Sequence, residues 1–253
     1  MSIIFFNEGV NKVSKYLITT VVVLFAIYYF IYSTPTWVLS YFISKYSDQN
    51  FAISNQSGTF WQGSGLLVIN NPALKGAIPV MDINWHITLG LKKLISVHLS
   101  SFNNTIAVVT VDKNGLHLND LSLTVSLSQT SYLLAALHSL DLAGTVNITS
   151  SDGINIGRHG GMEGTINANL YHLSSTISPL NPIGDYSATM NLKSGVIIVK
   201  TINDAIIKID GEGSIRGLTL NASVQPDKKD KLLQFMVMFG DQVGDNQYKL
   251  KLI

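Results

Sequence analysis

The sequence contains no cysteine, and only 13% of its residues are charged, against roughly 25% in an average soluble domain. The lack of cysteine excludes disulfides, thiol catalysis and zinc sites built on cysteine. The formal net charge is +1, so no overall field attracts nucleic acid, and we expect no nucleic-acid partner. Strand pairing and the burial of apolar side chains are left to hold the fold together.

The groups that carry out catalysis are also scarce. The six histidines are scattered and never form the i, i+4 pair of a helical metal site. Glu163 and Glu212 lie beside glycines in expected turns, and neither a Gly-x-Ser-x-Gly nor a Ser-x-x-Lys motif occurs. We therefore expect a protein that is not an enzyme, with no catalytic residues, no cofactor and no metal site.

The N-terminal part of the chain contains a long uncharged run, residues 16–44. Its most apolar part, residues 16–32, approaches the ~20 residues that a helix needs to cross a bilayer. Aromatic side chains suited to the headgroup region gather at the end of this part: Tyr28, Tyr29, Tyr32 and Trp37. Lys12 and Lys15 precede the run, which places the N-terminus in the cytoplasm because basic flanks stay inside.

These features predict three segments: a cytoplasmic N-terminus (1–15), a transmembrane helix (16–34) and a β-rich domain outside the cytoplasm (35–253). A cleaved signal peptide is the alternative for the apolar run. We favour the anchor, because the residues after the run lack an Ala-x-Ala site and Pro35 would hinder cleavage there.

Beyond residue 35, apolar and polar residues alternate, as in strands with one covered face. The clearest segments are 81–89, 121–128, 165–170 and 186–192. Turn signals of the Asn-Gly, Asp-Gly or Ser-Gly type end at Gly115, Gly153, Gly195 and Gly211. Residues 227–240 and 131–138 have the apolar spacing of short amphipathic helices.

Together these patterns predict a mainly β fold. A meandering sheet, a curled half-barrel and a sandwich all fit the strand spacing. We expect an antiparallel sheet that is curled or forms a half-barrel, with one or two short amphipathic helices packed on it.

Three blocks of the sequence carry more specific information than the fold class. The first is Pro35–Leu39, then Ser57-Gly-Thr-Phe-Trp-Gln-Gly63 and a strand that contains Trp85. The second is Ser178–Tyr186, in which Gly184 and Asp185 precede an alternating strand. The third is Ala222–Pro226, the amphipathic helix and Asn246–Leu250. In this order the blocks resemble the type II secretion system protein N family, although Phe60 stands where that family often has an aliphatic residue.

The resemblance implies an inner-membrane protein of a Gram-negative bacterium with its bulk in the periplasm. It implies an accessory subunit of the machine that exports folded proteins across the outer membrane, with the other subunits as partners. A free sheet edge that accepts a partner's strand is one way to make such contacts. The family brings no catalytic residues, so we interpret its motif residues as structural or interaction residues: Gly58, Trp61, Gly63, Trp85, Gly184, Asp185 and Tyr186.

The alternating strands also support a function of another class. With the single anchor, they resemble the AsmA-like proteins, whose curled sheets carry lipid across the periplasm in an apolar groove, and this implies phospholipid as a partner. The candidate groove residues are Ile83, Trp85, Ile87, Leu123, Val125 and Ala168. An open trough along these side chains favours lipid handling, whereas a closed core favours a scaffold.

Overall fold

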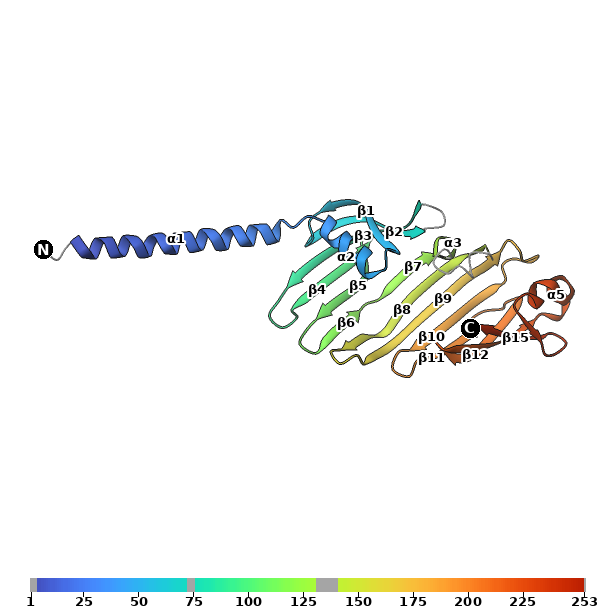
Figure 1. Cartoon of the computed structure of the whole chain (residues 1–253). Coiled ribbons are helices and arrows are strands. Elements are labelled where there is room, and N and C mark those ends of the chain that lie inside the picture. Colours follow the sequence, from blue (N-terminus) through green and yellow to red (C-terminus); the bar gives the residue numbers. More distant parts are fainter. Residues whose placement is uncertain (1–3, 72–75, 131–140, 253) are drawn as a thin grey trace.

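The computed structural model describes residues 4–71, 76–130 and 141–252, and it shows one long helix leading into a large antiparallel sheet (Figure 1). The helices of these residues are α1 (Ile4–Tyr32), α2 (Trp37–Tyr46), α3 (Leu127–Thr130) and α5 (Lys229–Val237), with a 3-10 turn η2 (Pro226–Lys228). The strands are β1 (Phe51–Gly58), β2 (Gln62–Asn71), β3 (Gly76–Leu89), β4 (Ile95–Ser101), β5 (Asn104–Val111), β6 (Gly115–Asn119), β7 (Ser122–Ser126), β8 (Leu142–Gly157), β9 (Met162–Ser175), β10 (Gly184–Asn191), β11 (Val196–Thr201), β12 (Ile207–Ser214), β13 (Gly217–Val224), β14 (Gly240–Gln242) and β15 (Gln247–Leu252).

The helix α1 contains the apolar run. Its residues Lys15–Tyr32 are long and apolar enough to cross a membrane, and none of this stretch is buried against the rest of the protein. A single span and a signal sequence both have this length and composition. The expected N-terminal apolar helix is therefore present, and its orientation stays a prediction.

The sheet is a long meander of hairpins. In the part of the chain that the structure describes it has 15 strands, and neighbouring strands are mostly consecutive in the sequence. This confirms the predicted mainly β fold and the antiparallel pairing. The sheet is neither closed nor strongly curled, so the expected curled or half-barrel form is not adopted. Each end of the sheet packs on its own helix, α2 or α5, and the two edges therefore do not approach each other (Figure 1).

The strand registers align apolar side chains on one face of the sheet, which we call the apolar face. One row across β3, β4, β5, β6 and β8 consists of Ile87, Val97, Val109, Leu118 and Ile154. A second row across β7 to β11 consists of Leu123, Ile148, Ala168, Ala188 and Val199. Ile154 of the first row and Ile148 of the second both belong to β8, and their side chains lie on the same face of the sheet. The apolar face therefore continues from one end of the sheet to the other.

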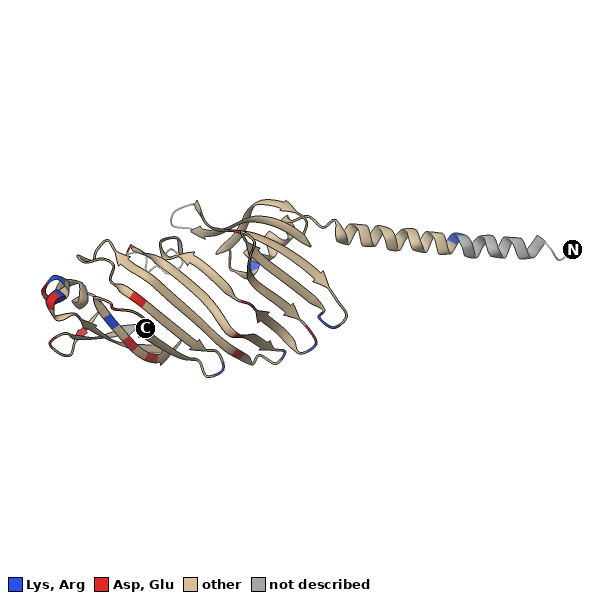
Figure 2. Cartoon of the chain, turned by 180° about the vertical axis from the view of Figure 1, so that it is seen from behind, with Lys and Arg blue, Asp and Glu red and all other residues tan. Residues whose placement is uncertain are grey.

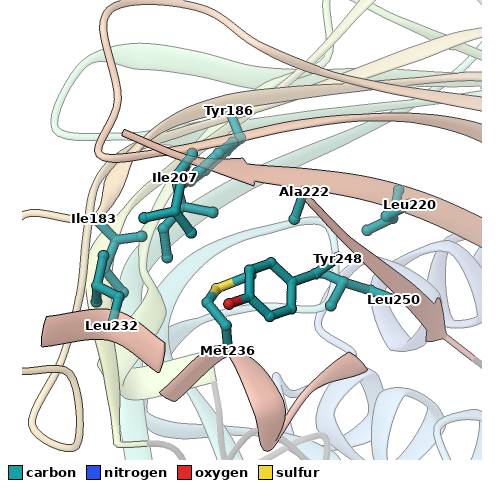
Figure 3. Packing of buried hydrophobic residues seen from close by; sticks show 10 residues of the cluster. Ile183, Tyr186, Ile207, Leu220, Ala222, Leu232, Met236, Tyr248 and Leu250 are labelled. Atoms are coloured by element: carbon teal, nitrogen blue, oxygen red, sulfur yellow. Dashed lines mark hydrogen bonds between the residues drawn. The ribbon is translucent and has the colours of Figure 1, made fainter. Parts of the chain in front are cut away.

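At the C-terminal end of the sheet, α5 covers the apolar face. Leu232 and Met236 of α5 are 0% and 2% exposed. They belong to one cluster with Leu220, Tyr248 and other buried residues of β10, β12, β13 and β15. Figure 3 shows the Met236 side chain beside the Tyr248 ring. The predicted helix at 227–240 is thus confirmed, as η2 and α5 over 226–237, while 131–138 lies outside the described residues.

Two of the predicted turns differ from the structure. Gly211 lies inside β12, not in a turn, and its neighbours explain why it is glycine: a Cβ there would lie 2.7 Å from Cδ2 of Leu220 on the adjacent strand. Gly153 lies within β8, at an irregularity of the pairing, where its φ of +70° requires a residue tolerant of left-handed backbone. Gly115 and Gly195 do lie at hairpins, as predicted.

Candidate functional site

The turn between β1 and β2 joins the end of α1 to the sheet. The backbone N–H of Phe60 donates to the carbonyl of Thr34 (2.8 Å), and Pro35 forms an isolated β-bridge with Thr59. The Trp61 indole N–H donates to the carbonyl of Ile31 at 2.8 Å. That carbonyl belongs to the last turn of α1, and it also accepts the N–H (3.2 Å) and the hydroxyl (2.7 Å) of Thr34, which lies outside the helix. A side chain 30 residues away therefore caps the apolar helix.

Trp85 supports the same turn from the sheet. Its indole N–H lies 3.2 Å from the carbonyl oxygen of Thr59 and 3.1 Å from that of Phe60, and the side chain is 2% exposed. Gly63 lies against the ring, and a Cβ at this position would be 2.5 Å from Cζ2 of Trp85. Gly58 begins the turn with φ +94°, a conformation that favours glycine. The structure thus brings together four of the motif residues, Gly58, Trp61, Gly63 and Trp85.

A cleft of about 1170 Å³ lies between this turn, the end of α1 and strands β3 and β4. Tyr28, Ile31 and Tyr32 of α1 line one side. The facing side includes His86 and His98, which are cross-strand partners of β3 and β4. Two histidines alone do not make a metal site, and the described residues contain no group of three or more histidines and carboxylates that could hold a metal.

The other three motif residues lie elsewhere, at the start of β10. The Tyr186 hydroxyl donates to the carbonyl of Ile207 at 2.7 Å, and burial raises the pKa of this phenol. Gly184 is required because a Cβ there would lie 2.8 Å from that hydroxyl oxygen. The Asp185 carboxylate accepts the backbone N–H of His172 (2.7 Å) and the side-chain amide of Asn203 (2.9 Å). These bonds stabilise the ionised form and lower the pKa of Asp185.

The six candidate groove residues all lie on the apolar face. Ile83, Trp85 and Ile87 belong to a cluster with Leu39 and Ile43 of α2, which covers them. Leu123 and Val125 of β7 and Ala168 of β9 are half-buried. Along the rim of the face, Leu89, Ile95 and Met162 are 65%, 38% and 43% exposed.

The helix α2, which the sequence did not lead us to expect, also occupies the outer edge of β1. The Ser40 hydroxyl donates to the carbonyl of Ile53 (3.2 Å) and accepts its N–H (3.3 Å). The Ser47 hydroxyl accepts the N–H of Phe51 at 3.0 Å. The backbone groups that an incoming strand needs are thus in use, so β1 is a poor site for strand addition. No motif marks these serines, because single serines in an uncharged run are common.

A histidine–aspartate pair lies outside these clusters, at the β5–β6 hairpin. His117 Nδ1 lies 2.6 Å from Oδ1 of Asn155, and its Nε2 lies 3.2 Å from Oδ1 of Asp112. The bond to Asn155 and then the bond to Asp112 raise the pKa of His117. The same Asp112 oxygen accepts the N–H groups of Asn114 and Gly115. Asp112 therefore shapes a turn, and this pair needs no catalytic explanation.

Comparison with known families gives one match. The model for Type II secretion system (T2SS), protein N, matches residues 49–251. The matched region includes the turn at Ser57–Gly63, Trp85 and Gly184–Tyr186, whereas α1 and α2 precede it. No curated protein and no solved structure matches the chain.

Replacing Gly63 by alanine tests the packing of the turn on Trp85. We expect Gly63→Ala to lower the free energy of unfolding by about 1–3 kcal/mol, because the added methyl overpacks a buried ring. Gly217→Ala is the matched control, since nothing lies within 4 Å of a Cβ there, and it should change stability by less than about 0.5 kcal/mol. Chemical unfolding of the detergent-solubilised chain, followed by tryptophan fluorescence, checks both. All three tryptophans (37, 61 and 85) lie at this end of the molecule. Equal stability of the two variants would contradict the packing argument.

Replacing Asp185 by asparagine tests the charged acceptor at His172. Because the pKa of Asp185 is lowered on folding, its contribution is complete above the ordinary aspartate value of about 3.9 and is lost as the pH falls through the lower folded-state value. Discounted for partial exposure, the loss in Asp185→Asn at pH 7 should be about 1 kcal/mol. The difference in stability between the two proteins should be smaller at pH 3 than at pH 7, because the unfolded-state carboxyl is protonated at pH 3. A difference that is as large at pH 3 as at pH 7 would rule out the charge as its cause.

Proposed function

The chain belongs to the type II secretion system protein N family, and from that membership we propose that it is an accessory inner-membrane subunit of the system. In this proposal it acts through protein–protein contacts in the periplasm while folded proteins are exported. The family is a structural component of secretion and not a family of enzymes. The observation that carries the proposal is the family match over most of the β sheet, together with the turn that joins this sheet to an apolar helix.

The proposed topology follows from α1. Residues 1–15 lie in the cytoplasm, 16–34 span the inner membrane and 35–253 form the periplasmic domain. The two lysines before the span and the aromatic residues at its end support this orientation. The exposed apolar surface of α1 supports a lipid environment, because apolar side chains that the rest of the protein leaves unburied are unfavourable in water.

The surface offered to partners is polar but low in charge. Figure 2 shows lysines, arginines and carboxylates at turns and at α5, and also on strands near the C-terminal end of the sheet. On the face opposite the apolar face, one row consists of Thr88, Ser96, His117 and Asn155 together with Thr110, which is buried between its neighbours. Burying such a surface removes few charges from water, and the cores of protein interfaces are depleted of charged residues in the same way. Since α2 occupies the edge of β1, contacts through the faces are favoured over strand addition there.

A second candidate function is lipid binding, and one observation favours it. Between the parts covered by α2 and α5, the apolar face carries half-buried side chains such as Val109, Leu118 and Ala168. Exposed Leu89, Ile95 and Met162 border it. A face of this kind can hold an acyl chain as well as a protein partner.

Deleting the chain from its own bacterium tests the secretion role. We expect a substrate of type II secretion to accumulate in the periplasm, and the wild-type chain to restore its export. Other subunits of the system should co-purify with the tagged chain from detergent-solubilised inner membranes, and quantitative mass spectrometry measures their enrichment. Gly217→Ala should restore export like the wild type. Normal export in the deletion strain, together with a tagged chain that purifies without any secretion subunit, would sink the proposal.

A pair of neighbouring substitutions in β5 separates lipid binding from protein contacts. Val109 lies on the apolar face and Val108 on the opposite face, and both are half-buried. If the apolar face holds lipid, Val109→Asp should reduce the phospholipid that co-purifies with the detergent-solubilised chain, and Val108→Asp should not, as native mass spectrometry can measure. Circular dichroism checks that both variants keep the sheet. Equal phospholipid in the two variants would leave the apolar face without a lipid role.

A further inference from the structure

The hairpin between β3 and β4 has a tip of unusual composition, which we call the leucine–lysine tip (residues 89–95). Its sequence is Leu-Gly-Leu-Lys-Lys-Leu-Ile. Leu91 is fully exposed, and Leu89 and Leu94 are 65% and 52% exposed. Nothing in the described part of the protein covers these side chains. A soluble hairpin gains no stability from three exposed leucines, so their presence requires another explanation.

The neighbouring hairpin tips on the same side of the sheet are different. The β5–β6 tip contains Lys113-Asn-Gly, the β8–β9 tip Arg158-His-Gly-Gly and the β10–β11 tip Lys193-Ser-Gly. The first two tips contain no aliphatic residue, and the β10–β11 connection contains one, the half-buried Leu192. The β12–β13 tip on the same side carries one exposed aliphatic residue, Ile215 (72% exposed), so what distinguishes the β3–β4 tip is that three exposed leucines gather in it.

The tip also carries an unneutralised positive charge. Lys92 and Lys93 are both exposed. Among the residues that the structure describes, the ion pairs involve other lysines and a histidine, so these two cations have no carboxylate partner. Two unpaired lysines between exposed leucines complement a partner that has an apolar interior beneath a negatively charged surface. An anionic phospholipid bilayer has this composition.

The position of the tip in the molecule is consistent with contact between the tip and such a bilayer. Thr88 and Leu89, at the base of the tip, line the same cleft as Tyr28 and Tyr32 of α1. Those tyrosines belong to the aromatic end of the apolar helix, which suits the headgroup region. In Figures 1 and 2 the tip of the β3–β4 hairpin points toward the side of the sheet from which α1 extends. It reaches about the level at which α1 ends. The tip thus reaches the depth at which the helix leaves the membrane.

From these observations we propose that the leucine–lysine tip inserts into the outer headgroup region of the membrane that α1 crosses, with its leucines among the acyl chains and its lysines on anionic phospholipid. The proposal rests on the assignment of α1 as a membrane anchor under the proposed function. Because α1 already tethers the tip, insertion is intramolecular and needs little affinity of its own. Two attachments then fix the orientation of the sheet relative to the membrane, which one helix alone cannot do.

The absence of cysteine provides the experiment. Leu91→Cys gives a single site for an environment-sensitive NBD label, and Ser194→Cys at the β10–β11 tip is the control. The full-length proteins are reconstituted into vesicles of phosphatidylethanolamine and phosphatidylglycerol. We expect a blue shift and a several-fold rise in NBD emission at position 91, with quenching by headgroup-level spin-labelled lipid. The NBD emission at position 194 should remain that of a label in water. Adding Lys92→Glu and Lys93→Glu should reverse the change at position 91.

The outcomes separate the failure of the tip from the failure of the anchor. If the protein floats with the vesicles and resists carbonate extraction, but position 91 emits like position 194, the tip does not insert and the proposal is wrong. Protection of position 91 that needs added secretion subunits, and does not occur in lipid alone, would identify the tip as a protein contact and would also overturn it. If the chain neither floats nor resists extraction, the anchor itself is wrong, and this inference falls with it.

Discussion

An open sheet of alternating strands has one apolar face, and the rest of this structure depends on how that face is covered. No second sheet packs on it in the described residues, and the two edges do not meet to enclose it. Helix α2 covers one end through Leu39 and Ile43, and α5 covers the other through Leu232 and Met236. Since burial of apolar area is the main stabilising contribution in a chain without disulfides, these two short helices determine where the sheet is rigid.

The covering at the N-terminal end has a second consequence, because it positions the apolar helix. Trp85 is buried by α2 and by the β1–β2 turn, and its indole fixes the backbone of that turn. The fixed turn presents Trp61 to the last carbonyls of α1. The packing of Trp85 in the sheet thereby fixes the turn, and the turn fixes the end of the helix, through the hydrogen bonds of two indole groups. The family motif around Gly58 and Gly63 is explained by this arrangement, since side chains at those positions would displace the turn.

Much of the sheet could be predicted from the sequence, because alternation is a local signal: 81–89 and 165–170 lie within strands, and 186–192 lies in β10 except for its last residue. The errors have physical causes. Gly211 resembled a turn residue, but its small size serves close packing on Leu220. Helix α2 was not foreseen because Leu39 and Ile43 lie in the second part of an uncharged run, outside the predicted span 16–34, and were assigned to the β-rich domain without a helix. The bond from Trp61 to Ile31 could not be foreseen, because no local pattern specifies a partner 30 residues away. The open shape of the sheet likewise depends on packing at both ends and not on any one strand.

The short connection after α1 limits how the sheet can move relative to α1. Residues 33–36 separate α1 from α2, and two of them are already engaged: Thr34 accepts the N–H of Phe60, and Pro35 bridges to Thr59. A connection of this kind does not act as a flexible linker, because its backbone groups are bonded to the domain that it carries. The direction of α1 and the plane of the sheet are therefore coupled. A partner would meet the polar face of the sheet at a defined position and angle relative to α1, and recognition can then rely on shape and position even though the face carries little charge.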